Sequence, residues 1–344
     1  LYDRGGDDTP NLGGTTTTIY NPATLKTEHQ FLSLCGTEFN CAGGTTPWGS
    51  WLTCEESFED PGIAKTIEGS EYFRDLRHGY VFEVPSSATE LVPAVALKDM
   101  GRFEHEAAAV HPPTGIVYLT EDRWHSLFYR FIPNQPGQLH KGGRLQALAI
   151  SGQPSKNTHN WEARDVSVNE TLTTHWIDLD DVDGDENDLS KRGAAAGAAT
   201  FARGEGLCIA GDRFAVTCTI GGQARLGQVF TYKPSPYEGS ADEKTAPGEL
   251  MLIAESEANS LLKNCDNVTM TPWGDLLACE DTDHDNGHCA MVGIQPDGSQ
   301  YLIAYNAYTD SEFAGACFSS DGKILFVNIQ YPGMTIAITG PWSV

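Results

Sequence analysis

The chain has 344 residues, of which 40% are hydrophobic and 10% aromatic, enough for a sizeable core in one large or two average domains. Its 47 acidic and 22 basic residues give a formal net charge of −25, and a surface of that sign repels a nucleic-acid backbone. No apolar run reaches the length of about 18 residues that a transmembrane helix needs. We therefore expect neither a nucleic-acid partner nor a transmembrane segment.

In chain order, the first predicted strand is 15–20, which is rich in β-branched side chains, and the second is 28–34. The next strands are predicted at 50–55, 78–84 and 91–97. A clear set of four then follows at 103–110, 116–121, 126–132 and 144–150. Four successive strands joined by short turns have the up-and-down order of one propeller blade.

Residues 151–200 interrupt this rhythm and read as an insertion, a lid or a loop across one face, with the one plausible helix at 182–200. Three more repeats follow at 203–255, 266–305 and 313–338. The sequence thus predicts an all-β fold, one β-propeller domain over residues 1–344 with six blades.

The last repeat is one strand short, and we expect the two spare N-terminal strands to close the ring, because open edge strands promote aggregation. The chain starts at Leu1 rather than Met. We expect a processed chain or a fragment in which the N-terminal part of the first blade is missing.

One phrase recurs in these repeats: a Gly turn, an apolar strand and a polar residue at the strand's end. The clearest copies are 48–56 (WGSWLTCEE), 114–122 (TGIVYLTED) and 273–281 (WGDLLACED), and looser copies lie at 211–217 and 322–328. The residues six positions after each Gly are Glu55, Glu121, Thr217, Glu280 and Asn328. Three carboxylates at one structural address predict a shared site.

Further acids on the strands that precede these turns extend the candidate site, namely Glu106, Glu205, Asp266 and Glu312. Many converging oxygen ligands suit Ca²⁺ or ferric iron. The alternative for each Glu is a strand-end residue bonded to turn amides. Residues 281–287 (DTDHDNG) also resemble the start of a calcium loop, with a solvated acidic turn as the alternative.

The nine Cys cannot be paired from sequence alone. Cys35 with Cys41, and Cys208 with Cys218, are possible disulfides. Cys54 precedes two Glu, which suggests a thiolate ligand, although an inert buried thiol is the alternative. Arg203 is suited to two-point binding of phosphate, with surface ion pairing as the alternative.

Several strings resemble the PhoX-type alkaline phosphatases over nearly the whole chain. They are 46–56 (TPWGSWLTCEE), 101–108 (GRFEHEAA), 312–319 (EFAGACFS), 327–333 (VNIQYPG) and 338–342 (ITGPW). The resemblance implies a six-bladed propeller, export to the periplasm or outside the cell, and a metal cluster of calcium and ferric iron at the channel mouth. It also implies hydrolysis of small phosphate monoesters, and we expect a monomer.

By motif match, the resemblance implies Cys54 as an iron ligand and assigns further metal ligands to Glu55, Glu106, Glu121, Glu205, Glu280, Glu312 and Asp266. It places Arg203 and Glu205 on the phosphate, and Glu106 with them in catalysis. Two other classes of function stay open. One is a phosphodiesterase or a calcium-dependent, lactonase-like hydrolase on the same scaffold, and the other is a non-catalytic propeller that binds a partner.

Overall fold

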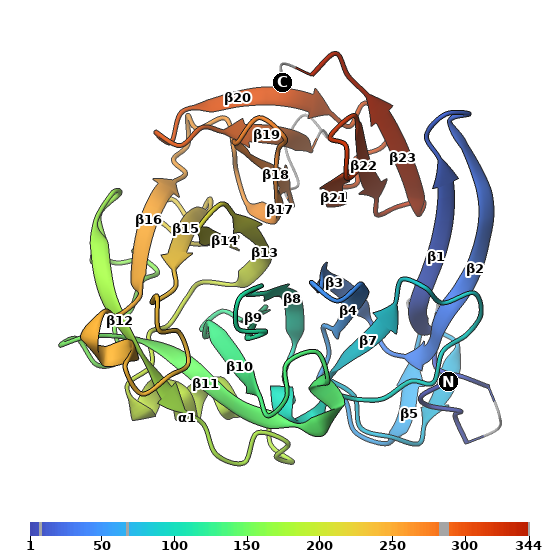
Figure 1. Ribbon diagram of the computed structural model, residues 1–344, viewed down its shortest axis with the longest axis horizontal. Coiled ribbons are helices and arrows are strands. Elements are labelled where there is room, and N and C mark those ends of the chain that lie inside the picture. Colours follow the sequence, from blue (N-terminus) through green and yellow to red (C-terminus); the bar gives the residue numbers. More distant parts are fainter. Residues whose placement is uncertain (7–8, 67–68, 282–288, 343–344) are drawn as a thin grey trace. The chain divides into compact units, whose positions relative to one another are not determined.

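The computed structural model describes residues 1–6, 9–66, 69–281 and 289–342 (Figure 1). The chain divides into two compact units. Unit 1 consists of Leu1–Asp122, Tyr129–Gln146 and Asp178–Leu189, and unit 2 of Arg123–Phe128, Ala147–Ile177 and Ser190–Val344. Among the described residues there is one α-helix and 23 strands, which confirms the all-β prediction.

Unit 1 holds the strands of the first two repeats and two short 3-10 helices. In chain order these are β1 (Gly13–Asn21), β2 (Lys26–Thr37), β3 (Asn40–Thr45), β4 (Ser50–Glu55), β5 (Gly62–Lys65), β6 (Glu71–Arg74), β7 (Val81–Pro85), η1 (Lys98–Met100), β8 (His105–Val110), β9 (Val117–Glu121), β10 (Tyr129–Pro133), η2 (Leu139–Lys141) and the start of β11 (Gly143–Ile150). Strands β3, β4 and β7 form one meander, and β8, β9, β10 and β11 follow one another in the up-and-down order of a blade.

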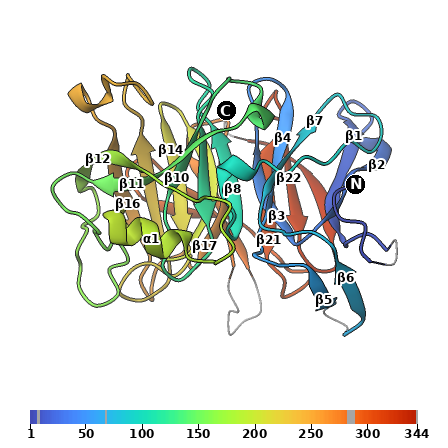
Figure 2. The same ribbon diagram turned by 90° about the horizontal axis from the view of Figure 1, so that it is seen from below.

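Unit 2 holds the later repeats. Its elements are β12 (Thr171–Asp178), α1 (Leu189–Ala196), β13 (Gly204–Ala210), β14 (Arg213–Cys218), β15 (Gln228–Lys233), η3 (Glu243–Thr245), β16 (Glu249–Glu255), β17 (Cys265–Met270), β18 (Leu276–Glu280), β19 (Ala290–Ile294), β20 (Gln300–Tyr305), β21 (Phe313–Phe318), β22 (Ile324–Ile329) and β23 (Met334–Thr339). Strands β13–β16, β17–β20 and β21–β23 form three antiparallel meanders, and the last is one strand short, as predicted (Figures 1 and 2).

The meanders of unit 2 bury apolar side chains between their faces. One cluster joins Val229 on β15 to Val268 on β17 and Val292 on β19. A second cluster packs Met291 on β19 against Leu325 on β22. Side chains alternate between the two faces of a strand, so each meander contributes to the layers on both sides. Face-to-face packing of successive meanders is the arrangement expected of propeller-like blades.

Two of three local expectations were wrong. Residues 91–97 are not a strand, because Pro93 has no amide to donate, although Val92, Ala94 and Ala96 still pack on the cluster around Tyr80. The insertion at 151–200 does contain a strand, β12, which pairs with β16. The predicted helix at 182–200 exists but is limited to α1.

The N-terminal strands also differ from expectation. Strands β1 and β2 pair with each other as a separate two-stranded sheet, so strand pairing does not support their predicted role in completing another blade. A tight turn joins them, and local antiparallel pairing satisfies their backbone groups. No helix in the described part of the chain has the length and apolarity to cross a membrane.

A buried clasp fixes the N-terminal segment to unit 1. The imidazole of His78 contacts the Asp3 carboxylate through Nε2 at 3.1 Å and the Glu55 carboxylate through Nδ1 at 2.8 Å, and all three side chains are fully buried. Asp3 also accepts hydrogen bonds from the backbone amides of Asp75 and Leu76. Burial alone would lower the pKa of His78, but the hydrogen bonds to Glu55 and Asp3 outweigh it and raise the pKa above its ordinary value.

We expect this clasp to make stability fall at alkaline pH. A raised folded-state pKa gives stability that is complete below the ordinary His pKa, about 6.5, and is lost as pH rises through the folded value. The loss is about 1.4 kcal/mol for each unit by which folding raises the pKa. Urea unfolding of wild type and His78→Gln between pH 6 and pH 10 measures it. If the free energy of unfolding changed with pH in the same way in both proteins, the predicted contribution of His78 would be contradicted.

Candidate active site

The first strand of each meander, β3, β8, β13, β17 and β21, carries a β-bulge at the same place in its pairing with the next strand. Two residues there face one residue of the partner, which redirects the first side chain out of the normal alternation. The first bulge residues, in chain order, are Cys41, Glu106, Glu205, Asp266 and Gly315. Metal-binding residue types therefore occupy four of five equivalent positions.

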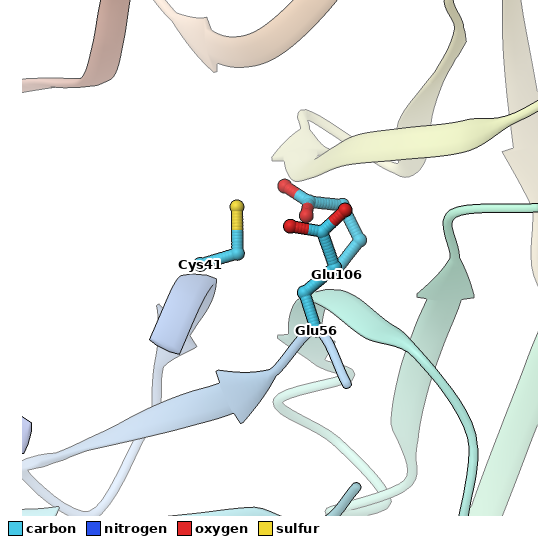
Figure 3. A group of neighbouring side chains, drawn as sticks. All are labelled: Cys41, Glu56 and Glu106. Atoms are coloured by element: carbon cyan, nitrogen blue, oxygen red, sulfur yellow. The ribbon is translucent and has the colours of Figure 1, made fainter. Parts of the chain in front are cut away.

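In unit 1 the bulges bring a thiol and two carboxylates together. The ligand atoms of Cys41 on β3, Glu56 just after β4 and Glu106 on β8 all lie within 4.8 Å of one another (Figure 3). An isolated bridge between Glu56 and Glu104 holds the end of β4 beside the start of β8. Cys41 is exposed, whereas Glu106 is fully buried. A thiolate with two carboxylates is a donor set that fits a transition metal such as iron. The residue types of this group are therefore those of a metal site.

Cys54, predicted as the iron ligand, is not the Cys in this group. It lies on β4 opposite the Cys41 bulge and is fully buried. Burial, with a smaller effect from the Glu106 carboxylate, raises the pKa of its thiol well above the ordinary value. Cys41 is the thiol that lies with the Glu56 and Glu106 carboxylates, and the full burial of Cys54 fits the alternative of a buried thiol.

Glu55 and Glu280, also predicted as ligands, accept hydrogen bonds from protein donors at both oxygens. Glu55 accepts from the amides of Glu38, Gly79 and Tyr80 at 2.8–3.0 Å, besides its contact with His78. Glu280 accepts from the amides of Lys263 and Ala290 at 2.8 and 2.9 Å. These hydrogen bonds connect the end of the second strand of a meander to two other segments. One is the segment just before the first strand, and the other is the start of the third strand. The structure thus favours the turn-amide alternative over the metal-ligand prediction.

Glu121 occupies the equivalent position on β9. It is fully buried and accepts a hydrogen bond of 2.7 Å from the hydroxyl of Tyr129 on the next strand. In the third repeat the count of six from Gly211 gives Thr217, but strand pairing puts Cys218 at this address, opposite Gly204. Thr217 instead donates to the carbonyls of Gly206 and Asp266, which is a scaffold role.

In unit 2 a second group forms around Arg203. Its guanidinium contacts Glu205 at 2.8 Å through Nη2 and Asp281 at 3.8 Å through Nη1. The Glu205 carboxylate lies within 4.8 Å of that of Asp266. Arg203 has a φ of 54°, which is unusual for a residue other than glycine and typical of functional sites. The arrangement offers planar donors for a phosphate beside two bulge carboxylates.

Glu312 adds to this second group a carboxyl group that titrates near neutral pH. Burial and the neighbouring Asp281 carboxylate raise its pKa to about 7, and Arg203 partly offsets them. A carboxylic acid that titrates near neutral pH can give or take a proton during a reaction. Of the predicted calcium loop at 281–287, only Asp281 belongs to the described residues, and the rest lies outside them.

All nine Cys lie in the described part of the chain and none is part of a disulfide, so the two disulfides that spacing allows are not formed. Strand pairing gives the reason for the second, because Cys208 lies opposite Ala215 while Cys218 lies opposite Gly204. Cys41 instead faces the carboxylates of its bulge group.

The sequence analysis missed Cys41 and Glu56 because it counted six positions from each Gly turn. That count leads to the end of the second strand of a meander, whereas Cys41 lies on the first strand and Glu56 just after the second. The bulge adds one residue to the first strand, and an alternating pattern does not show where that residue sits. A signal was present, since a Cys or an acid comes directly before a small or polar residue near the start of the first four of these strands: Cys41-Ala42, Glu106-Ala107, Glu205-Gly206 and Asp266-Asn267.

Comparison with known proteins gives the wider context. The sequence matches the family described as "Alkaline phosphatase PhoX" over residues 10–333. No curated protein matches the sequence. The solved structure of Pseudomonas fluorescens PhoX in complex with vanadate, a transition state analogue, is similar with a TM-score of 0.68 and 20% identity, covering 95% of this chain and 75% of that one.

Virginiamycin B lyase from Staphylococcus aureus reaches a TM-score of only 0.36 at 9% identity, covering 96% of this chain and 76% of that one, too low to support an argument. The likeness to the Pseudomonas structure shows a shared fold. The family match extends over both units, including the bulges that carry Cys41, Glu106, Glu205 and Asp266. The chain therefore belongs to the alkaline phosphatase PhoX family.

Proposed function

We propose that the protein is a metal-dependent phosphatase that hydrolyses small phosphate monoesters. The observation that carries this proposal is the recurrent bulge, which turns a thiol and three carboxylates out of equivalent strands in a member of this family. The metals proposed are iron and calcium. Bound at these ligands, they would polarise the phosphate and supply an activated oxygen nucleophile.

Cys41, Glu56 and Glu106 would hold the transition metal, since they combine one soft sulfur ligand with hard oxygens. Glu205 and Asp266 are oxygen ligands of the kind that calcium prefers. Glu121 and Glu312 stay predicted ligands. Glu55 and Glu280 are left out of this proposal because their oxygens already accept backbone hydrogen bonds.

Arg203 would bind the phosphate through two donors of its guanidinium and offset the charge that develops on the phosphoryl oxygens. Its contact with Glu205 keeps the guanidinium in place before the ester binds.

A panel of three esters tests the reaction class. We expect turnover of p-nitrophenyl phosphate, with little turnover of bis(p-nitrophenyl) phosphate and none of a γ-lactone. Preferred turnover of the diester would support the phosphodiesterase alternative, and preferred turnover of the lactone the lactonase-like one. No turnover of any of them by metal-loaded protein would leave the non-catalytic binding module as the better reading.

Three finer features complete the proposal: six blades, export to the periplasm or outside the cell, and a monomeric state. Support for the blade number comes from five recurring meanders together with the N-terminal hairpin β1–β2. Support for export and for a monomer comes from the family resemblance alone. Cell fractionation of the native host and light scattering of the purified protein test these two features directly.

A further inference from the structure

Beside Arg203 in unit 2 lies an aromatic cluster, made of Trp124, His125, His159, Trp161 and Arg225, that neither group described above uses. The ring centroid of Trp161 lies 6.0 Å from that of Trp124, 5.3 Å from that of His125 and 4.4 Å from that of His159. The guanidinium carbon of Arg225 lies 4.8 Å from the Trp161 ring. The rings meet edge to face or tilted, and aromatic rings in such arrangements with a cation over one of them form a surface that binds flat aromatic groups.

The cluster is accessible. Trp124 is 60% exposed, and His125 and Arg225 are exposed as well. An exposed Trp has no packing role to explain it, since burying an indole is favourable. Two positively charged side chains lie in this region, Arg225 in the cluster and Arg203 near it, although the chain has a net charge of −25. Their positive charge attracts an anion to this part of the surface.

A backbone hydrogen bond places Trp124 of the cluster close to Arg203 of the proposed phosphate site. The amide of Arg203 donates to the carbonyl of Arg123 at 3.0 Å, and Trp124 is the next residue. With standard backbone dimensions, this hydrogen bond limits the separation of the Trp124 and Arg203 Cα atoms to about 7 Å. The two side chains therefore start from neighbouring positions of the backbone.

A second connection runs through Trp161. Its indole Nε1 donates to the carbonyl of Ile220 at 2.6 Å. The preceding residue, Thr219, donates its amide to the carbonyl of Arg203 at 3.0 Å. Trp161 is thereby held in a fixed orientation by the segment that also supports Arg203. A rigid, pre-oriented ring loses little freedom when a second ring stacks on it.

We propose that the aromatic cluster binds the aromatic part of the substrate, a nucleobase or an aryl group, while the phosphate of the same monoester lies at Arg203. This inference rests on the proposed phosphatase function and narrows it to a substrate class. Aromatic leaving groups stack on Trp124 against the ring of Trp161. Aliphatic esters, such as sugar phosphates, reach Arg203 without this contact.

Two substrates that differ only in the base test the inference, AMP and ribose 5-phosphate. We expect Trp124→Ala to lower kcat/KM for AMP about tenfold, within the range found for bases stacked on aromatic side chains. The value for ribose 5-phosphate stays unchanged, and Trp124→Phe keeps most of the AMP activity. Tyr308→Ala, which removes another exposed aromatic side chain in unit 2, is the matched control and changes neither value.

p-Nitrophenyl phosphate separates the two sources of the aromatic group. If any flat ring suffices, Trp124→Ala lowers its kcat/KM as well, and if a nucleobase is needed, only AMP is affected. Both results support the cluster. Equal losses on AMP and ribose 5-phosphate, or no loss on either, would overturn it.

Failure of the phosphatase proposal is a separate result, in which wild type hydrolyses none of the three esters. The cluster is then judged by binding alone. AMP binding in equilibrium dialysis that is present in wild type, kept in Trp124→Phe and weakened in Trp124→Ala supports it. Absence of AMP binding by wild type rejects it.

Discussion

Replacing Cys41 by Ser should abolish both iron binding and catalysis. The sulfur of Cys41 lies within 4.8 Å of the Glu56 and Glu106 carboxylates. In this group of three residues, Cys41 supplies the sulfur ligand and the two Glu supply oxygen ligands. A hydroxyl is a poor substitute for a thiolate on a transition metal. We expect the iron content of the purified protein to fall below a tenth of the wild-type value. Turnover of p-nitrophenyl phosphate should fall at least about 10³-fold, a loss typical when catalysis by a metal ion is removed.

Cys54→Ala is the matched control, because it removes a thiol from the strand opposite the Cys41 bulge. It leaves a small cavity in a fully buried position and should cost about 1–2 kcal/mol of stability. Iron content and turnover should stay within about twofold of wild type. If Cys54→Ala lost the iron and Cys41→Ser kept it, the motif-based assignment of Cys54 would be right and the structural assignment wrong.

Replacing Arg203 by Lys should lower kcat/KM for phosphate monoesters by about 10²- to 10³-fold, since Lys has no planar pair of donors for phosphate. The contact of 2.8 Å to Glu205 shows that the guanidinium is already oriented. Steady-state kinetics on p-nitrophenyl phosphate measure the effect, and metal content should be unchanged. A loss of metal together with activity would mean that Arg203 supports the metal site rather than the phosphate.

Arg144→Lys is the control for the Arg203 variant. Arg144 is exposed and contacts only Asp178 among the ion pairs of the described residues, at 3.4 Å. Exposed ion pairs contribute little to stability, so activity and unfolding midpoint should both match wild type. A comparable loss of activity in Arg144→Lys would show that any change of Arg to Lys disturbs the protein nonspecifically.

Much of the fold could be predicted from sequence because antiparallel strands leave a regular signal. The predicted strand at 50–55 coincides with β4, and four strands predicted between 103 and 150 correspond to β8–β11. The Gly turns at Gly49 and Gly274 have positive φ, 82° and 94°, which is why Gly recurs before the apolar run. Short strands with local turns need only neighbouring residues to define them.

The site was harder to predict because the address that repeats most visibly in sequence is structural. Glu55 and Glu280 recur because each ties three strands of its meander together by accepting backbone hydrogen bonds. The position that we propose for the metal ligands is the bulge, which has no fixed distance from the turn. Finding Cys41 requires knowing that β3 pairs Asn40 with Glu55 and Gly43 with Thr53, and pairing register comes from tertiary packing.

The family resemblance added expected roles to three residues that the strand pattern and side-chain chemistry had already singled out, Glu106, Glu205 and Arg203. All three lie on or next to first-strand bulges, as the structure shows for β8 and β13. The resemblance points to Cys54, whereas the spatial grouping points to Cys41, which lies on the strand that pairs with the Cys54 strand. Only the spatial grouping of Cys41 with two carboxylates distinguishes them.

Metal analysis combined with activity tests the central claim most directly. Purified wild-type protein should contain iron and calcium, and its p-nitrophenyl phosphate turnover should disappear after EDTA treatment and return when calcium is added. The same preparation of Cys41→Ser should contain calcium without stoichiometric iron and should stay inactive. Full turnover in a protein free of iron, or activity that resists EDTA, would contradict the account.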